Sequence, residues 1–279
     1  NLISQRPCLP LPRMNHPSVD IVIPCLNESA YIKACVRSVL MQAYPKEKLK
    51  VWVVDGMSND GTKEILNSML KEESRLEVLE NPERVTPVSL NLGIHAGTAE
   101  VVIILGAHAE LEADFVVKNV QALSEHPDAG CAGGMILNLF ENKEAEIISA
   151  AMASPFGVGN ARFRTGGEAG YVDTVAFGAY RRSVLDEIGL FDEGLVRNQD
   201  DELNYRLTKN GHKIWFDPEI RSRYYVRGSY KKVFSQYRQY GYWKVFVNVK
   251  HKNITTWRQL IPFLWVCFLI GGGVLSVVF

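Results

Sequence analysis

The sequence has few cysteines and no excess of charge of either sign. Its 279 residues include five cysteines, Cys8, Cys25, Cys35, Cys131 and Cys267, and no C-x-x-C pair. This odd, scattered set argues against a disulfide framework and against a structural zinc site. Lysine and arginine together number 31, as do aspartate and glutamate, so the formal net charge is zero. Such a balance argues against a protein that binds mainly to phosphate backbones, and no nucleic-acid partner is expected.

Two common nucleotide-binding motifs are also missing. The sequence contains neither G-x-G-x-x-G nor G-x-x-x-x-G-K-[ST], which excludes a dinucleotide fingerprint and a P-loop. Residues 1–18 carry four prolines and lack the apolar stretch of a secretory signal peptide, so they are predicted to form an N-terminal tail. Hydrophobic residues make up 47% and charged residues 22% of the chain, which is ordinary for a folded protein.

The balanced net charge conceals an asymmetry along the chain. Residues 1–202 hold 18 basic and 29 acidic residues, residues 203–258 hold 13 basic and 2 acidic residues, and residues 259–279 hold none. About 20 apolar residues in a helix cover about 30 Å, the thickness of a hydrocarbon core. Residues 259–279 are therefore predicted to form a transmembrane helix, with a buried core helix as the alternative. The basic residues before this run predict that the preceding domain lies in the cytoplasm, at a plasma membrane or cell inner membrane.

Short β-branched runs alternate with helical patterns from Val19 onward. The runs occupy residues 19–24, 50–55, 75–80 and 100–105, each bounded by Pro, Gly, Asn or Asp. Between the first two runs, Ile32, Cys35, Val36 and Val39 follow the 3/4 spacing of a helix, for which Ser29 is the predicted cap. The alternation predicts an α/β fold with a mostly parallel sheet and flanking helices over residues 19–228.

Polar side chains follow three of these predicted strands. The segments are Pro24-Cys25-Leu26-Asn27-Glu28, Asp55 to Thr62, and Gly106-Ala107-His108-Ala109-Glu110. Ligands of parallel sheets bind outside the carboxyl ends of the strands, so a binding site is expected at this edge. An aspartate at a strand end is also a common turn former, and Asp60 beside Gly61 fits either role.

Five ordered segments resemble those of the family-2 inverting glycosyltransferases of the GT-A fold. They are IVIPCLNE, VVDGMSNDGT, NLGIHAG, VAFGAYRRSVLDEIGLFDE and NQDDELNYRL. The resemblance extends from about residue 19 to about residue 244 and is greatest to the succinoglycan-type glucosyltransferases of exopolysaccharide assembly. It implies transfer of a hexose from a nucleotide diphosphate sugar, expected to be UDP-linked, to a hydroxyl of a saccharide. The membrane-proximal end favours a polyprenyl-linked acceptor. A non-catalytic partner subunit with this fold and a processive polysaccharide synthase remain as alternatives.

The resemblance also implies which residues hold the donor and take the proton. Asp55 is expected to accept hydrogen bonds from the base or ribose of the nucleotide. The other expected donor contacts are Pro24, Asn27, Glu28, Asp60 and Ala107. In Asn198-Gln199-Asp200-Asp201-Glu202 the resemblance makes Asp200 the catalytic base, with Gln199 in place of the usual glutamate. Acids are also favoured in the first turn of a helix, which is the structural alternative.

The triplet Gly106-Ala107-His108 lies where the family carries an Asp-x-Asp or Asp-x-His metal motif. The first acid is missing here. The resemblance implies a divalent cation, Mn²⁺ or Mg²⁺, with His108 as a ligand, and imidazole suits Mn²⁺ better than the harder Mg²⁺. The alternative is that His108 is a polar rim residue and that no metal binds tightly.

Two further segments contain candidate contacts. The glycine-rich stretch 154–170 is predicted to be a mobile loop, in which Arg162 and Arg164 either bind phosphate or acceptor groups or are solvated. Residues 229–258 interleave aromatic and basic residues, which is typical of a segment that lies among lipid headgroups. Within this stretch Gln236, Arg238 and Trp243 resemble the family segment that closes over the nucleotide sugar, although the usual Q-x-x-R-W spacing is not kept.

Overall fold

The computed structural model describes residues 16–226, 228–255 and 260–278. Its centre is one nine-stranded sheet of order β3-β2-β1-β4-β8-β6-β9-β5, with β7 beside β9. The strands are β1 (Val19–Cys25), β2 (Leu49–Asp55), β3 (Leu76–Glu80), β4 (Val101–Ile104), β5 (Ala109–Leu111), β6 (Ala129–Leu139), β7 (Gly170–Val172), β8 (Ala176–Arg181) and β9 (Lys213–Tyr225). The helices are α1 (Ile32–Leu40), α2 (Thr62–Leu70), α3 (Thr86–Ala96), α4 (Phe115–Glu125), α5 (Lys143–Met152), α6 (Pro155–Val158), α7 (Arg162–Thr165), α8 (Arg182–Ile188), α9 (Gln199–Lys209), α10 (Tyr230–His251) and α11 (Ile261–Val278), and a 3₁₀ turn η1 spans Lys46–Lys48.

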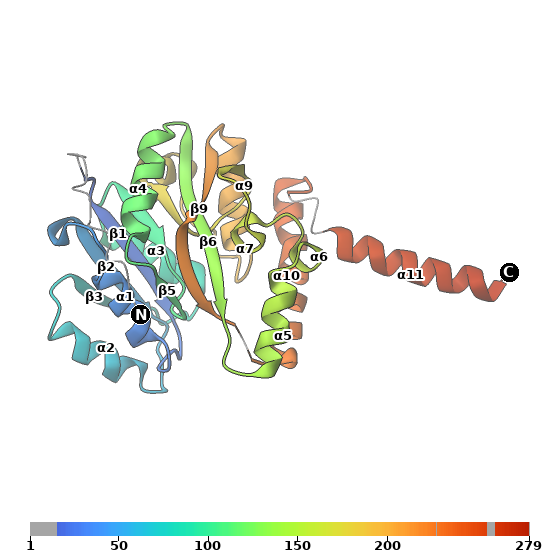
Figure 1. Cartoon of the computed structure of the whole chain (residues 1–279), viewed down its shortest axis with the longest axis horizontal. Helices are drawn as coiled ribbons and strands as arrows, with labels where there is room; N and C mark the ends of the chain where they lie inside the picture. The colour runs from blue at the N-terminus through green and yellow to red at the C-terminus, as the bar shows by residue number, and fades with distance from the viewer. Residues whose placement is uncertain (1–15, 227, 256–259, 279) are drawn as a thin grey trace, which may run out of the picture.

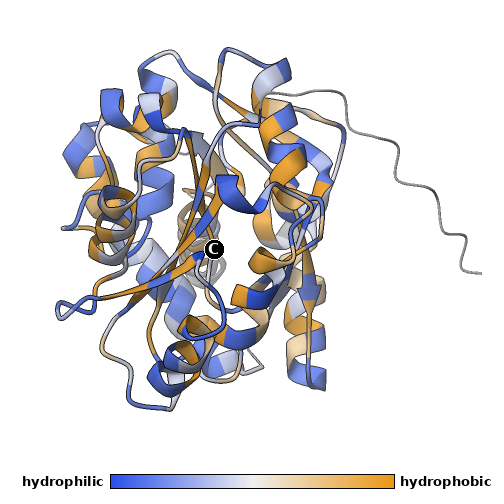
Figure 2. Ribbon diagram, turned by 90° about the vertical axis from the view of Figure 1, so that its left-hand side faces the viewer, coloured by the Kyte–Doolittle hydropathy of each residue, from blue (hydrophilic) through white to orange (hydrophobic). Residues whose placement is uncertain are grey.

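The first half of the sheet is parallel and buried on both faces. β1 pairs in parallel with β2 and β4, and β2 pairs in parallel with β3. Ile21 and Ile23 pack with α1, α2 and α4, whereas Val22 on the opposite face packs with α3, α8 and α9. Figure 2 shows the apolar residues concentrated on these central strands. Because helices cover both faces, the strands are nearly continuous β-branched runs without a polar side.

The second half of the sheet is mixed. β8 is antiparallel to β4 and β6, β9 is parallel to β6, and β5 and β7 are antiparallel to β9 (Figure 1). Six strands, β1, β2, β3, β4, β6 and β9, consequently point in one direction. The predicted α/β fold with a mostly parallel sheet is confirmed.

Two local predictions are wrong. Ser29 does not cap α1, whose N-cap is Tyr31 with no capping side chain; the backbone N–H of Ser29 instead donates to Asp60 Oδ2 at 3.1 Å. The stretch predicted to be a loop over residues 154–170 contains the short helices α6 and α7. Gly157 lies within α6, whereas Gly159, Gly166 and Gly167, between and after these helices, have positive φ.

The C-terminal helices lie on one side of the sheet (Figure 1). α10 packs against α5 through Val233, Ile148 and Met152, and α11 extends away from the rest of the chain. Over the described residues, no helix has both the length and the hydrophobicity needed to span a bilayer, so the transmembrane helix predicted for residues 259–279 is not borne out. Residues 1–15 of the predicted tail, and residues 259 and 279, lie outside the described residues.

Candidate active site

The loops after β1 and β2 are joined by reciprocal hydrogen bonds. The backbone N–H of Asn27 donates to Ser58 Oγ at 2.8 Å, and the backbone N–H of Asn59 donates to Asn27 Oδ1 at 2.9 Å. Asn27 has φ 57°, a left-handed conformation that asparagine tolerates better than most residues. Pro24 lies just before this loop, paired with Val54 in the sheet. The two loops therefore form one wall at the carboxyl edge of the sheet.

Asp55 is buried at the base of this wall. The residue is 1% exposed, and its carboxylate accepts hydrogen bonds from the hydroxyl and the backbone N–H of Ser58, the latter at 3.0 Å. Lys63 Nζ lies 3.9 Å from Asp55 Oδ2. Asp55 thus shapes the turn after β2, and its expected contact with a nucleotide remains a prediction.

Asp60 holds the start of α2. Its Oδ1 accepts from the backbone N–H of Thr62 at 3.1 Å and from the Thr62 hydroxyl, and its Oδ2 accepts from Ser29. These bonds, those to Thr62 above all, hold the pKa of Asp60 below its usual range. This arrangement fits Asp60 as a turn former, because both of its carboxylate oxygens accept hydrogen bonds from the loop after β1 and from the start of α2.

His108 and Glu28 meet where β4 and β1 end. His108 Nδ1 lies 3.2 Å from Glu28 Oε1, which places the proton of a neutral imidazole on Nδ1 because the carboxylate can only accept. Ala107, expected beside the donor, instead packs its methyl group into the core and is 2% exposed. Of the predicted triplet, His108 is therefore the residue whose side chain reaches the site.

The residues at this edge fit a divalent cation only in part. A metal-binding histidine commonly donates its other ring N–H to a carboxylate, and Glu28 is placed to orient His108 in that way. In the described part of the chain, no three His, Cys, Asp or Glu side chains form a group that could hold a metal ion. Divalent ions in phosphate chemistry are often held by one or two protein groups plus the phosphates of the substrate. The site therefore fits an ion that takes most of its ligands from a bound diphosphate.

We expect Gly106→Asp to raise affinity for Mn²⁺ by about tenfold or more, because it adds a carboxylate beside His108. A side chain fits here: Gly106 is not among the positive-φ residues, and a Cβ would meet the ring edge of Phe177 at 3.4 Å, an ordinary contact. Mn²⁺ titrations with and without UDP measure the effect. Gly106→Asn is the matched control of similar shape, and equal affinities of the two variants would contradict the expectation.

Tyr224 connects His108 to the glycine-rich segment. The rings of His108 and Tyr224 are 5.0 Å apart, and the guanidinium of Arg164 lies 5.7 Å from the Tyr224 ring. Arg162 points elsewhere: its Nη1 donates to the backbone oxygen of Glu168 at 3.2 Å. The structure thus brings Arg164, and not Arg162, to the side of the site where His108 lies.

Asp200 lies in the first turn of α9. Asp200 is an exposed residue. Desolvation by the surrounding protein nonetheless raises the pKa of its carboxyl group. The negative charge of Asp201 raises this pKa further, and the positive charge of Lys244 lowers it. The backbone N–H of Asp201 donates to Asp200 Oδ1 at 2.9 Å. Desolvation raises the pKa of Tyr240 above its usual value, and the negative charge of Asp200 raises it further.

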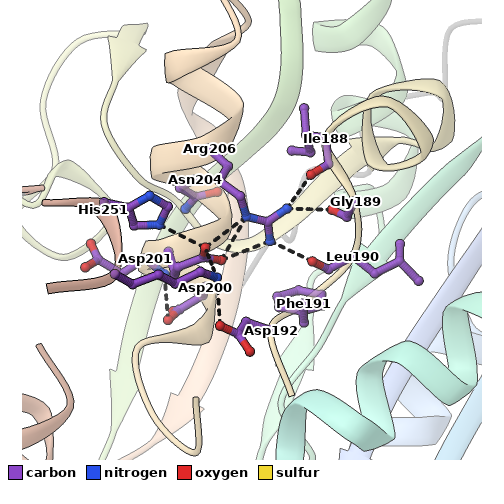
Figure 3. A network of polar contacts seen from close by, with 12 residues as sticks. Ile188, Gly189, Leu190, Phe191, Asp192, Asp200, Asp201, Asn204, Arg206 and His251 are labelled. Atoms are coloured by element: carbon purple, nitrogen blue, oxygen red, sulfur yellow. Dashed lines mark hydrogen bonds and ion pairs between the residues drawn. The ribbon is translucent and has the colours of Figure 1, made fainter. Parts of the chain in front are cut away.

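The two acids after Asp200 are held by cations. Lys244 Nζ forms an ion pair with Asp201 Oδ2. Glu202 is 0% exposed and lies 2.9 Å from Arg206 Nη2, 2.8 Å from Lys250 Nζ and 3.0 Å from His251 Nε2, in the network where Figure 3 labels Arg206 and His251. Burial alone would raise the pKa of Glu202, but hydrogen bonds from Arg206 and Lys250 hold it below its usual range. Within the described ranges no lysine, arginine or histidine forms an ion pair with Asp200.

The candidates on α10 lie in different places. Gln236 Nε2 donates to the Tyr240 hydroxyl at 2.6 Å, which puts Gln236 beside the site. Arg238 is exposed. Trp243 is half-buried and packs on the rings of Tyr242 and Phe246. Only Gln236 of the three is linked to the residues around Asp200.

Tyr224, Tyr240 and Lys244 are site residues that no motif had indicated. Tyr224 is the last residue but one of the 13-residue strand β9, whose pairing with β5 and β6 places it beside His108. Tyr240 and Lys244 belong to the basic aromatic stretch, where their neighbours have the same composition. The sequence indicates these two residues only through the four-residue spacing of Tyr240 and Lys244, which puts both on one face of a helix.

Comparisons with known proteins show the family of this chain. The family model described as Glycosyl transferase family 2 matches residues 20–189. The dolichyl N-acetyl-alpha-D-glucosaminyl phosphate 3-beta-D-2,3-diacetamido-2,3-dideoxy-beta-D-glucuronosyltransferase of Methanococcus voltae is 32% identical over 91% of this chain and 80% of its own length. The succinoglycan biosynthesis protein ExoA of Rhizobium meliloti is 29% identical over 92% of this chain and 78% of its own.

Solved structures share the fold at lower identity. The mannosyltransferase PcManGT from Pyrobaculum calidifontis, in complex with GDP-Man and Mn²⁺, superposes with a TM-score of 0.58 at 20% identity. The match covers 75% of this chain and 56% of the length of that solved chain. At this identity the likeness concerns the fold, which is that of the GT-A glycosyltransferases.

Proposed function

Because this chain belongs to glycosyltransferase family 2 and has the GT-A fold, we propose that it transfers a hexose with inversion from a nucleotide diphosphate sugar to a hydroxyl of a saccharide. The observation that carries the proposal is the first turn of α9. There Lys244 pairs with Asp201 and Lys250 pairs with Glu202, whereas Asp200 is an exposed residue that forms no ion pair with a lysine, arginine or histidine in the described part of the chain.

Asp200 is the base of this reaction. As the acceptor oxygen attacks the anomeric carbon, the bond from that carbon to the diphosphate oxygen breaks, and the hydroxyl proton passes to Asp200. The nucleoside diphosphate leaves with the electron pair. One displacement inverts the anomeric centre and needs one carboxylate, unlike the carboxylate pair of a retaining glycosidase. Desolvation and Asp201 make Asp200 a stronger base than an ordinary aspartate.

The donor lies along the wall formed by the loops after β1 and β2. Asp55 serves the base or ribose of a UDP-linked sugar, and Arg164 approaches its phosphates from the side of Tyr224. A divalent cation, when bound, neutralises the charge of the departing diphosphate. From this chain His108 would hold that ion, with Glu28 orienting the imidazole.

The acceptor is a lipid-linked saccharide of surface or extracellular polysaccharide assembly. The name of the M. voltae relative specifies a dolichyl phosphate-linked sugar acceptor, and the R. meliloti relative takes part in succinoglycan biosynthesis. The residues on the outer face of α10 support the proposal that the substrate is bound to a membrane. It exposes the apolar side chains of Phe234, Val245 and Val249 to solvent, with Lys231 and Lys232 at its start. This face lies among the headgroups of the cytoplasmic leaflet.

We expect Lys231→Gln/Lys232→Gln to weaken binding of the full chain to anionic vesicles by roughly 10- to 30-fold at low salt, since each basic residue contributes about 1 kcal/mol near such a surface. The loss should shrink at high salt, where screening removes the attraction from the parent as well. Lys46→Gln/Lys48→Gln, an equal change on the exposed turn η1, is the control in vesicle sedimentation. An equal loss in the control would contradict the assignment to α10.

Nucleotide release from a panel of UDP- and GDP-sugars tests the proposed function. The purified full chain is assayed with Mn²⁺, with Mg²⁺ and with chelator, in the presence of a short polyprenyl-phosphate saccharide. Release with one donor, together with an acceptor lengthened by one sugar of inverted anomeric configuration, supports the proposal. No release with any donor favours the non-catalytic partner, and acceptors lengthened by many sugars favour the processive synthase.

A further inference from the structure

Helix α10 holds the chain on both sides of Asp200. Ahead of Asp200, Arg197 Nε donates to Gln239 Oε1 at 3.0 Å, and Asn198 Nδ2 donates to the backbone oxygen of Tyr240 at 2.9 Å. After Asp200, Lys244 pairs with Asp201, and Lys250 and His251 pair with Glu202. Asp200 itself is flanked by these contacts and accepts from the backbone N–H of Asp201.

Of these contacts, the ion pair between Lys244 and Asp201 is the one nearest to Asp200 along the chain. The lysine is 6% exposed, a degree of burial that a charged ammonium group tolerates only when it is paired. Its partner Asp201 is adjacent to Asp200 in sequence, and two neighbouring carboxylates disfavour each other's ionisation. The lysine offsets the charge of Asp201 and attracts the charge of Asp200 as well.

From this geometry we infer that Lys244 is a positioning residue, which engages Asp201 so that Asp200 is the ionised carboxylate facing the acceptor. The inference rests on the proposed role of Asp200 as base. Within the described residues, the titratable and charged groups that interact electrostatically with Asp200 are Asp201 on its own helix, Lys244 and Tyr240 on α10, and Tyr180 on β8. Of these, Lys244 is the cation.

The test measures kcat, donor KM and the pH dependence of kcat for the full chain and its Lys244 and Asp201 variants. Lys244→Gln should lower kcat about tenfold and leave donor KM within about twofold of the parent. It should also move the acidic limb of the pH profile, where kcat falls as Asp200 is protonated, about half to one pH unit upward, because the positive charge that lowers the pKa of Asp200 is lost. Lys244→Arg, which keeps the charge, should restore the limb. Lys244→Gln/Asp201→Asn should also restore it, because the carboxylate left without Lys244 is then removed.

The outcomes separate this inference from the proposed function. If Asp200→Asn keeps the parent's rate, Asp200 is not the base and the proposed mechanism fails. If Asp200→Asn is inactive but the kcat of Lys244→Gln falls at the same acid pH as that of the parent, only the inferred role of Lys244 is wrong. A higher donor KM at unchanged kcat would also overturn it, since Lys244 would then bind donor. Should Lys244→Gln fail to fold, the double variant and Asp201→Asn, whose limb should move downward, decide the question.

Discussion

Asp200→Asn is expected to lower the rate of sugar transfer by about 10²- to 10⁴-fold, the usual contribution of a positioned base. Donor affinity should stay nearly unchanged, because Asp200 lies on α9 and the expected nucleotide contacts follow β1 and β2. Asparagine keeps the size of the side chain, so the hydrogen bond from the Asp201 backbone can persist. Nucleotide release with acceptor present, and donor binding by calorimetry, measure the two quantities.

The pH dependence provides a second check on Asp200. Its pKa is raised by desolvation and by Asp201, and a base works only when deprotonated. The rate should therefore fall as the pH drops through a value above the usual range of aspartate. Asp201→Asn is the matched control and should slow transfer far less. If Asp201→Asn shows the large loss and Asp200→Asn the small one, Asp201 is the base.

Glu202→Gln is expected to destabilise the fold by about 3–5 kcal/mol, which is typical when one partner of a buried ion pair is removed. Glu202 is fully buried and is the shared partner of Arg206, Lys250 and His251. Its neutralisation would leave Arg206, Lys250 and His251 without their common carboxylate and would weaken the attachment of α10 to α9. Urea unfolding of parent and variant at pH 7 measures the difference.

The loss should depend on pH in a defined direction. The pKa of Glu202 is lowered in the folded state, so its stabilisation is fully present above the unfolded value of about 4.3 and is lost as pH falls through the folded value. The gap between parent and variant should therefore narrow at acid pH. Glu77→Gln, which breaks the exposed pair with Lys50, should cost at most about 1 kcal/mol. A similar cost for both variants would contradict the central role of Glu202.

Several features of the site followed from the sequence because they depend on residues close together along the chain. The β-branched runs and the 3/4 spacing of Ile32, Cys35 and Val36 defined the alternation of strands and helices. Parallel strands bring their carboxyl ends to one edge, so the neighbourhood of Asn27 and Asp55 could be anticipated without coordinates. The sequence could not decide whether Asp60 forms the turn or contacts the donor, since aspartate is common in both roles.

The relations between distant segments needed the tertiary structure. Sequence alone determined the α/β class, the family and the edge of the sheet at which the polar loops meet. The fold decided that Tyr224 reaches His108, that Arg164 and not Arg162 joins them, and that Lys244 and Lys250 engage the acids after Asp200. The physical reason is that local patterns fix the elements, whereas the register of β9 and the docking of α10 depend on packing and charge pairing between residues about 40 to more than 100 positions apart.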